Sequence, residues 1–171
     1  MRETATTLAR VRWIVLASLA VVLTGCGGSS KSVVTTTTSA PPRPGPGKVL
    51  YQSAGWAVVL NGGSARALLL TSGGWRPDTS GLVKVSILGP HGIAAATPQV
   101  AAQLSAHAPL VESALWVDGT ELLEKGGGLT PNRGTIYGAP NAPLARGRHV
   151  AVAYGRTADH ATAVAWSFRV R

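Results

Sequence analysis

Two segments near the end of the chain carry an apolar residue at every second position, and this pattern constrains the fold more than any other feature. Successive side chains of a β-strand point to opposite faces, so a period of two indicates a strand. The segments are residues 148–154, with Val150, Val152 and Tyr154 in phase, and residues 163–170, with Val164, Trp166, Phe168 and Val170 in phase. We expect two adjacent strands, joined by a loop at 155–162, at the centre of a sandwich core.

Shorter apolar runs separated by turn residues extend the β pattern back to residue 49. A glycine-rich turn at 61–64 joins residues 56–60 to 65–71, and Asp118-Gly119 predicts a second hairpin. Residues 98–106 are compatible with a strand or a short helix, and the β neighbours favour a strand. Further strands are expected at 82–88, 113–117, 120–123 and 135–138, and loops at 72–81 and 126–134. About nine short strands without a confident helix predict an all-β fold, an antiparallel β-sandwich with an additional N-terminal β-hairpin.

The first 26 residues have the layout of an export signal. Arg2, Arg10 and Arg12 precede an apolar run, and the stretch Leu23-Thr24-Gly25-Cys26 follows it. An uncleaved membrane anchor is the alternative. The apolar run from Trp13 to Thr24 has 12 residues, whereas a spanning helix needs about 20. A cleaved signal at residues 1–25 therefore fits better.

Leu23-Thr24-Gly25-Cys26 resembles the lipobox of bacterial lipoproteins, and Cys26 is the only cysteine of the chain. An ordinary cleavage site beside a small residue is the alternative, but all four positions match the lipobox. The resemblance implies that the Cys26 sulfur takes a diacylglyceryl group, that cleavage occurs just before it, and that the new amino terminus takes a fatty acid such as palmitate. It places the protein on the cell membrane, lipid-anchored, at the extracytoplasmic face.

Residues 26–48 read as the lipidated cysteine followed by a disordered tether. The stretch is rich in glycine, serine, threonine and proline, and it has too little apolar surface to offset the entropy of ordering. Its threonine run is also a candidate for O-glycosylation, although a plain spacer is the simpler interpretation. Residues 49–171 follow as a single β-sandwich domain. No cysteine remains there for disulfides, so the hydrophobic core alone must stabilise the domain.

The charge of the chain is positive but spread out. The formal net charge is +9, and from residue 49 onward 10 basic and 6 acidic residues leave +4. A mildly basic domain favours adhesion to an anionic membrane or wall. No basic cluster with interleaved aromatic residues is present, and the signal directs the chain out of the cell, so we expect no nucleic-acid partner.

Residues 96–171 resemble bacterial Ig-like or fibronectin-like domains of surface proteins. The matching pieces are LWVDG at 115–119, the Pro-Leu-Ala-x-Gly-x-His stretch at 143–149, and WSFRV at 166–170. In such domains a W-x-F-x-V ending is the final strand, and L-x-x-G-x-H opens the strand before it. The loop at 155–162 lacks the Asp-x-x-Gly-Asn that these domains often carry, which removes a capped turn and any cation site built from it.

No motif for catalysis or for a metal is present. His91, His107, His149 and His160 show no ligand spacing, and the resemblance gives His149 a structural role. The chain has no Gly-x-Ser-x-Gly, no Ser-x-x-Lys, no facing carboxylate pair and no glycine-rich phosphate loop leading into a helix. We expect neither an enzyme nor a cofactor-binding protein.

Trp75 and Arg76, in the expected loop at 72–81, are the candidate binding residues. An exposed tryptophan beside an arginine suits stacking on a sugar ring or an aromatic partner. Trp75 folded down as a plug over the end of the sandwich is the alternative, and the apolar indole favours it. Trp56, Trp116 and Trp166 lie in expected strands and are assigned to the core.

Together these features predict a surface-exposed envelope lipoprotein, anchored through Cys26, with a non-enzymatic Ig-like module. Its partner would be an envelope protein or a glycan, and we expect a monomer. The alternative is an envelope carrier of a small ligand or a metal, which would show convergent histidines or a deep pocket.

Overall fold

Short β-strands joined by turns make up the structure, a computed structural model that describes residues 42–53, 55–122, 127–130 and 133–171. Cys26, the signal and most of the tether lie outside these residues. The strands are β1 (Lys48–Gln52), β2 (Trp56–Asn61), β3 (Ser64–Thr71), β4 (Gly74–Pro77), β5 (Val83–Gly89), β6 (Gly92–Ala94), β7 (Val100–Ala106), β8 (Glu112–Val117), β9 (Thr120–Glu121), β10 (Gly127–Thr130), β11 (Arg133–Gly138), β12 (Gly147–Arg156) and β13 (Ala161–Val170). The prediction of an all-β fold is confirmed. In this part of the chain, no helix has the length and apolarity needed to cross a bilayer.

The strands form three sheets. Sheet A has the order β1-β2-β3-β4, sheet B the order β10-β11-β7-β5, and sheet C the order β6-β13-β12-β8-β9. All pairings are antiparallel except that of β6 with β13, which is parallel. The expected hairpin at 56–71 is confirmed as β2–β3, but it is part of the four-stranded sheet A rather than an isolated addition.

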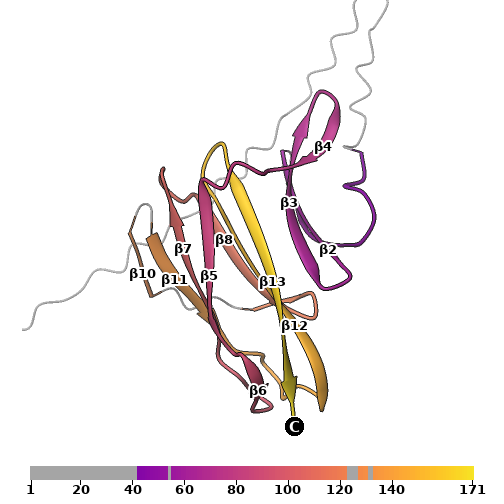
Figure 1. Ribbon diagram of the computed structural model, residues 1–171, viewed down its shortest axis with the longest axis vertical. Coiled ribbons are helices and arrows are strands. Elements are labelled where there is room, and N and C mark those ends of the chain that lie inside the picture. Colours follow the sequence, from indigo (N-terminus) through magenta and orange to yellow (C-terminus); the bar gives the residue numbers. More distant parts are fainter. Residues whose placement is uncertain (1–41, 54, 123–126, 131–132) are drawn as a thin grey trace, which may run out of the picture. The chain divides into compact units, whose positions relative to one another are not determined.

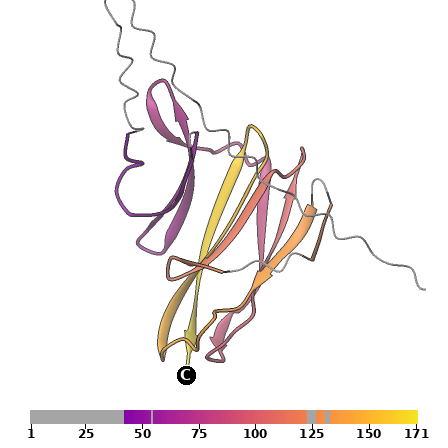
Figure 2. The same ribbon diagram turned by 180° about the vertical axis from the view of Figure 1, so that it is seen from behind.

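Sheet C lies between the other two sheets (Figures 1 and 2). One apolar cluster fills the space between sheets B and C, with Leu104 and Ile136 from sheet B and Leu115 and Phe168 from sheet C. A second cluster joins Trp56 and Val58 of sheet A to Trp116, Val152 and Tyr154 of sheet C. Because both faces of sheet C are covered, Ala151 to Gly155 are all buried.

The two period-two segments line two different apolar cores. The sequence had predicted that both segments line a single core. Val152 and Tyr154 of β12 face sheet A, whereas Trp166, Phe168 and Val170 of β13 face sheet B. The register explains the difference, because Trp166 is paired with Ala151 and Tyr154 with Ala163. Each large side chain thus lies beside an alanine of the neighbouring strand. The core positions predicted for Trp56, Trp116 and Trp166 are confirmed, since each indole is at most 8% exposed.

The strand predicted at 98–106 is confirmed as β7 (Val100–Ala106), but two expected loops contain strands. β4 lies within the expected loop at 72–81 and pairs with β3, and β10 lies within the expected loop at 126–134. In the first of these loops, Gly74 and Pro77 are the first and last residues of β4. Proline is accepted at an edge strand such as β4, where no neighbour needs its missing N–H.

Candidate functional site

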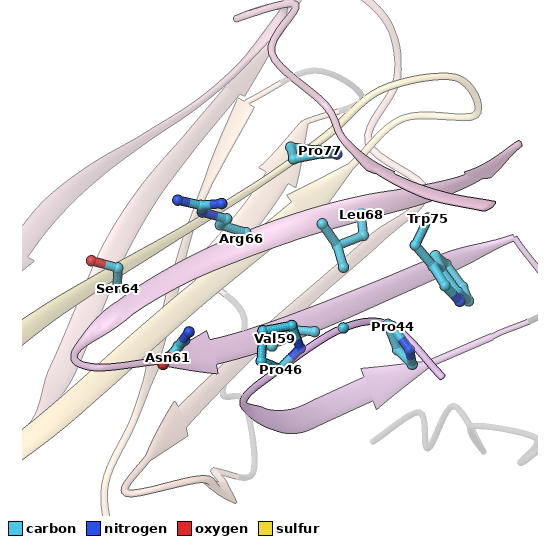
Figure 3. A pocket seen from close by; sticks show the side chains of 10 residues that line it. Pro44, Pro46, Val59, Asn61, Ser64, Arg66, Leu68, Trp75 and Pro77 are labelled. Atoms are coloured by element: carbon cyan, nitrogen blue, oxygen red, sulfur yellow. The ribbon is translucent and has the colours of Figure 1, made fainter. Parts of the chain in front are cut away.

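A groove crosses the face of sheet A that points away from sheet C (Figure 3). It has a volume of about 370 Å³. Trp75 and Pro44 lie at one end, and Asn61, Ser64 and Arg66 lie at the other. The ten lining residues are Pro44, Gly45, Pro46, Val59, Asn61, Ser64, Arg66, Leu68, Trp75 and Pro77.

Strand alternation gathers these side chains on one face. The pairs Asn61–Ser64 and Val59–Arg66 lie directly across β2 and β3, and Leu68 lies across from Pro77 of β4. Residues directly opposite each other share a face. The intervening residues of β2 and β3, such as Val58 and Ala67, therefore face sheet C and hold sheet A in place.

The Pro-rich segment before β1 forms the other wall of the groove. Pro44 is buried, although the sequence analysis placed it in the tether. The indole Nε1–H of Trp75 donates a hydrogen bond to the carbonyl oxygen of Pro42. Gly47 permits the close approach, because a Cβ there would lie 2.7 Å from the carbonyl oxygen of Leu60 and its φ is +122°. We call residues 42–47 the strap.

The two ends of the groove differ in chemistry. Trp75, Leu68 and Pro44 give one end flat apolar surfaces, and Trp75 packs on the small cluster of Ala57, Val59 and Leu68. At the other end Arg66 is exposed, and it is the only charged residue among the ten that line the groove. Within the described residues no carboxylate forms an ion pair with Arg66. The groove therefore suits a neutral or anionic ligand that has a ring or another flat surface.

Trp75 and Arg76 are not brought together. They are adjacent in β4, so their side chains point to opposite faces of sheet A. Trp75 is half-buried in the groove and Arg76 is exposed. Arg76 lies across from Leu69 and borders a separate shallow depression with Asp78, Asp159 and His160. Trp75 is therefore partly covered, as the plug alternative expected. Its indole packs on sheet A, however, and not over the end of a sandwich.

The described histidines do not converge. His149 is buried, with Nδ1 2.7 Å from Asp118 Oδ2 and Nε2 2.8 Å from the carbonyl oxygen of Ala145. His160 Nδ1 lies 3.4 Å from Asp78 Oδ2. In the residues that the structure describes, no three His, Cys, Asp or Glu side chains are placed to hold a metal ion.

One titratable cluster lies at the junction of sheets A and C. Arg156 Nε donates to Glu112 Oε2 at 2.6 Å, next to the rings of Tyr51 and Tyr154, whose centroids are 5.6 Å apart. Burial raises the pKa of both tyrosines, and the charge of Glu112 adds to the effect. Both hydroxyls therefore stay protonated at physiological pH. The cluster joins two sheets and presents no activated nucleophile.

Reasoning from the sequence missed the groove residues other than Trp75. The hairpin pattern carried a usable signal, because Asn61 and Ser64 are paired across the turn and Arg66 follows Ser64 by two positions, so the three side chains share a face. Nothing local in the sequence indicated that the strap lies across that face. No protein-family model matches the chain, and no curated protein shows significant similarity to it.

Proposed function

We propose that this protein is a membrane-anchored envelope lipoprotein whose β-domain is a non-enzymatic binding module. The lipobox around Cys26 supports the anchor, and the tether would connect the domain to the membrane at the extracytoplasmic face. The partner is an envelope protein or a glycan that contacts the groove on sheet A.

The observation that carries the binding role is the position of Trp75 in the groove. A large indole lies partly exposed between the strap and Leu68, and the same groove contains exposed Arg66, which forms no ion pair with any residue that the structure describes. Tryptophan and arginine are the residue types that contribute most binding energy at interfaces. Stacking on Trp75 together with hydrogen bonds to Asn61, Ser64 and Arg66 suits a glycan segment well.

The Ig-like assignment remains part of this proposal, and contacts between its three matching pieces support it. Asp118 belongs to LWVDG, His149 ends the second piece, and Phe168 belongs to WSFRV. The His149 ring bonds to Asp118 and stacks on Phe168, with ring centroids 5.6 Å apart. Three short motifs far apart in the sequence thus form one contact, as expected if they were selected together for a fold.

The same groove favours a small-ligand carrier as the second candidate. Its volume of about 370 Å³ lies within the range of small-molecule sites, roughly 300–1,000 Å³. Ligand length separates the two candidates. A carrier binds a monosaccharide-sized ligand as tightly as a longer one, whereas a glycan-binding module gains affinity with each added sugar that contacts the strap.

The test is a pull-down of envelope proteins and glycan fragments with the full chain, compared with Trp75→Ala and Arg76→Ala. Arg76 is the matched control, because it neighbours Trp75 in β4 and points to the other face. We expect Trp75→Ala to reduce capture at least tenfold, since a central tryptophan typically contributes about 2 kcal/mol or more. Arg76→Ala should have little effect.

Two results would contradict the proposal. If Trp75→Ala captures the same partners as the unchanged chain, the groove is not the binding surface. If Arg76→Ala weakens capture as strongly as Trp75→Ala, the surface includes the opposite face of β4, as the sequence alone suggested. A thermal melt of each variant separates loss of binding from loss of fold.

A further inference from the structure

Four arginines lie together where β12 begins and β13 ends: Arg146, Arg148, Arg169 and Arg171, which we call the arginine patch. Arg148 and Arg169 are direct cross-strand partners in the β12–β13 ladder. Like charges at directly opposite positions destabilise a sheet. The two strands pair despite this repulsion, so the placement of the two arginines requires an explanation.

No acidic side chain neutralises the patch within the described ranges. Three carboxylates form ion pairs in the described ranges, and none of their partners belongs to the patch. Asp118 pairs with His149, Glu112 with Arg156 and Asp78 with His160. All four arginines of the patch are exposed. Arg156, by contrast, has its carboxylate partner at 2.6 Å. The patch therefore presents unpaired guanidinium groups to whatever approaches this end of sheet C.

An exposed apolar side chain lies beside the arginines. Ile93 of β6 is paired with Arg169 and is 54% exposed. Figures 1 and 2 show β6 beside the final part of β13. Ile93 borders one shallow depression with Arg146, Arg169 and Arg171. Phe168 and Val170 face the core between sheets B and C, so Arg169 and Ile93 lie on the other face of sheet C.

We propose that the arginine patch docks this end of sheet C on an anionic lipid surface, with Ile93 entering the headgroup region. Guanidinium groups bind phosphate oxygens bidentately, and several basic residues near an anionic bilayer act together. A soluble polyanion would neutralise the arginines but would offer Ile93 no apolar environment, whereas a membrane interface offers both. This proposal does not depend on the groove or on the modification of Cys26.

The test uses the full chain carrying Cys26→Ser, so that an environment-sensitive fluorophore (NBD) attaches only at Ser167→Cys, mixed with vesicles of phosphatidylcholine or of phosphatidylcholine with phosphatidylglycerol. Ser167 is exposed and precedes Arg169 by two positions on the same face of β13. We expect a blue shift of the emission with the anionic vesicles alone, and its reversal as salt is added. The apolar run at 13–24 and the basic residues Arg2, Arg10 and Arg12 are common to all variants, so a difference between variants with the same anionic vesicles reports on the patch.

Charge variants locate the docking surface. Arg148→Gln with Arg169→Gln should lower the docking constant roughly 25-fold, about fivefold for each arginine. Arg66→Gln with Arg76→Gln removes the same charge from sheet A and should leave the blue shift in place. Relief of the cross-strand repulsion means that the first double variant should melt no lower than the unchanged chain, so a lost signal cannot be attributed to unfolding.

Three outcomes would overturn the proposal. One is an equal signal with neutral and anionic vesicles. Another is an equal loss in the two double variants, which would indicate general charge attraction without a defined surface. The third comes from Ile93→Ser: if docking is unchanged in this variant, Ile93 does not enter the headgroup region and the arginines act through charge alone. A fall in docking with Ile93→Ser at constant charge supports membrane contact.

Discussion

His149 donates a hydrogen bond from Nδ1 to Oδ2 of Asp118 at 2.7 Å, although the two residues lie 31 positions apart. The other carboxylate oxygen of Asp118 accepts the backbone N–H of Val150 at 2.9 Å. Asp118 has a φ of +52° in the turn between β8 and β9. One turn side chain thus holds the start of β12 in place.

The His149–Asp118 pair should make stability depend on pH. Both ring nitrogens face acceptors, Asp118 and the carbonyl oxygen of Ala145, so the imidazolium satisfies both. The bond to Asp118 raises the pKa of His149 above its ordinary 6.5. Because the pKa is raised in the folded state, the stabilisation is complete below pH 6.5 and is lost as the pH rises through the folded pKa.

Urea unfolding at a series of pH values tests this expectation. The unchanged chain should lose stability between mildly acidic and mildly alkaline pH, and His149→Gln should lose less over the same interval. Asp118→Asn keeps an acceptor for Val150 but removes the charge, so it should flatten the profile as well. Identical profiles for all three proteins would show that the pair is not linked to folding.

Cys26→Ser should release the protein from the membrane fraction or leave its signal uncleaved. The sulfur that would carry the lipid is then missing, and stable anchoring needs more than a single acyl chain. Fractionation with a fatty-acid label measures the outcome, and Trp75→Ala serves as a control that keeps the cysteine. A processed Cys26→Ser protein that still partitions to the membrane would refute the lipoprotein interpretation.

Trp166→Ala should strongly destabilise the domain. Trp166 is 8% exposed and contributes to the core between sheets B and C. Truncation of a buried tryptophan costs about 3–5 kcal/mol, a large share of a typical 5–15 kcal/mol stability. Chemical denaturation should show a smaller loss for half-buried Trp75→Ala. A melting temperature for Trp166→Ala within a few degrees of the unchanged chain would contradict this assignment.

Tyr154→Phe should leave stability unchanged or increase it by about 1 kcal/mol. The Tyr154 hydroxyl is buried and makes no hydrogen bond within the described residues, so its removal breaks no bond. Tyr51→Phe is the comparison, because that hydroxyl interacts with Ser53 and Glu112, and its loss should be destabilising. Urea unfolding measures both variants. If Tyr154→Phe loses more stability than Tyr51→Phe, the Tyr154 hydroxyl does form a stabilising hydrogen bond and this expectation is wrong.

Gly47→Ala should lift the strap from sheet A. The added Cβ would meet the Leu60 carbonyl oxygen and Val59 Cγ1 at 2.7 and 2.8 Å, and the positive φ disfavours any side chain. Trp75 would then lose its bond to Pro42, which NMR can follow through faster exchange of the indole N–H with water. Gly45→Ala is the matched control, because it lies in the same strap, also has a positive φ, and has open space around a Cβ. An equal response in both variants would show that backbone strain, and not the contact with β2, controls the strap.

The sequence by itself determined the local structure of most of the domain. Period-two alternation located β12 and β13, shorter apolar runs between turn residues located β2, β3, β5 and β8, and Asp118-Gly119 located the turn between β8 and β9. These features depend on backbone geometry and on side chains close in sequence, so each segment carries its own signal. The burial of Trp56, Trp116 and Trp166 followed from the same strand phase.

Only the tertiary structure decided which strands pair and which face meets which core. β4 and β10 are strands because β3 and β11 supply their hydrogen bonds. The glycines and prolines in these segments indicate loops when the sequence is considered locally, so the pairing could not be predicted. The separation of Trp75 from Arg76, the strap over the groove and the Arg148–Arg169 pair depend on contacts between residues far apart in the chain. Such contacts are set by the register of non-local pairs, and a register shift of one residue would move every side chain of a strand to its other face.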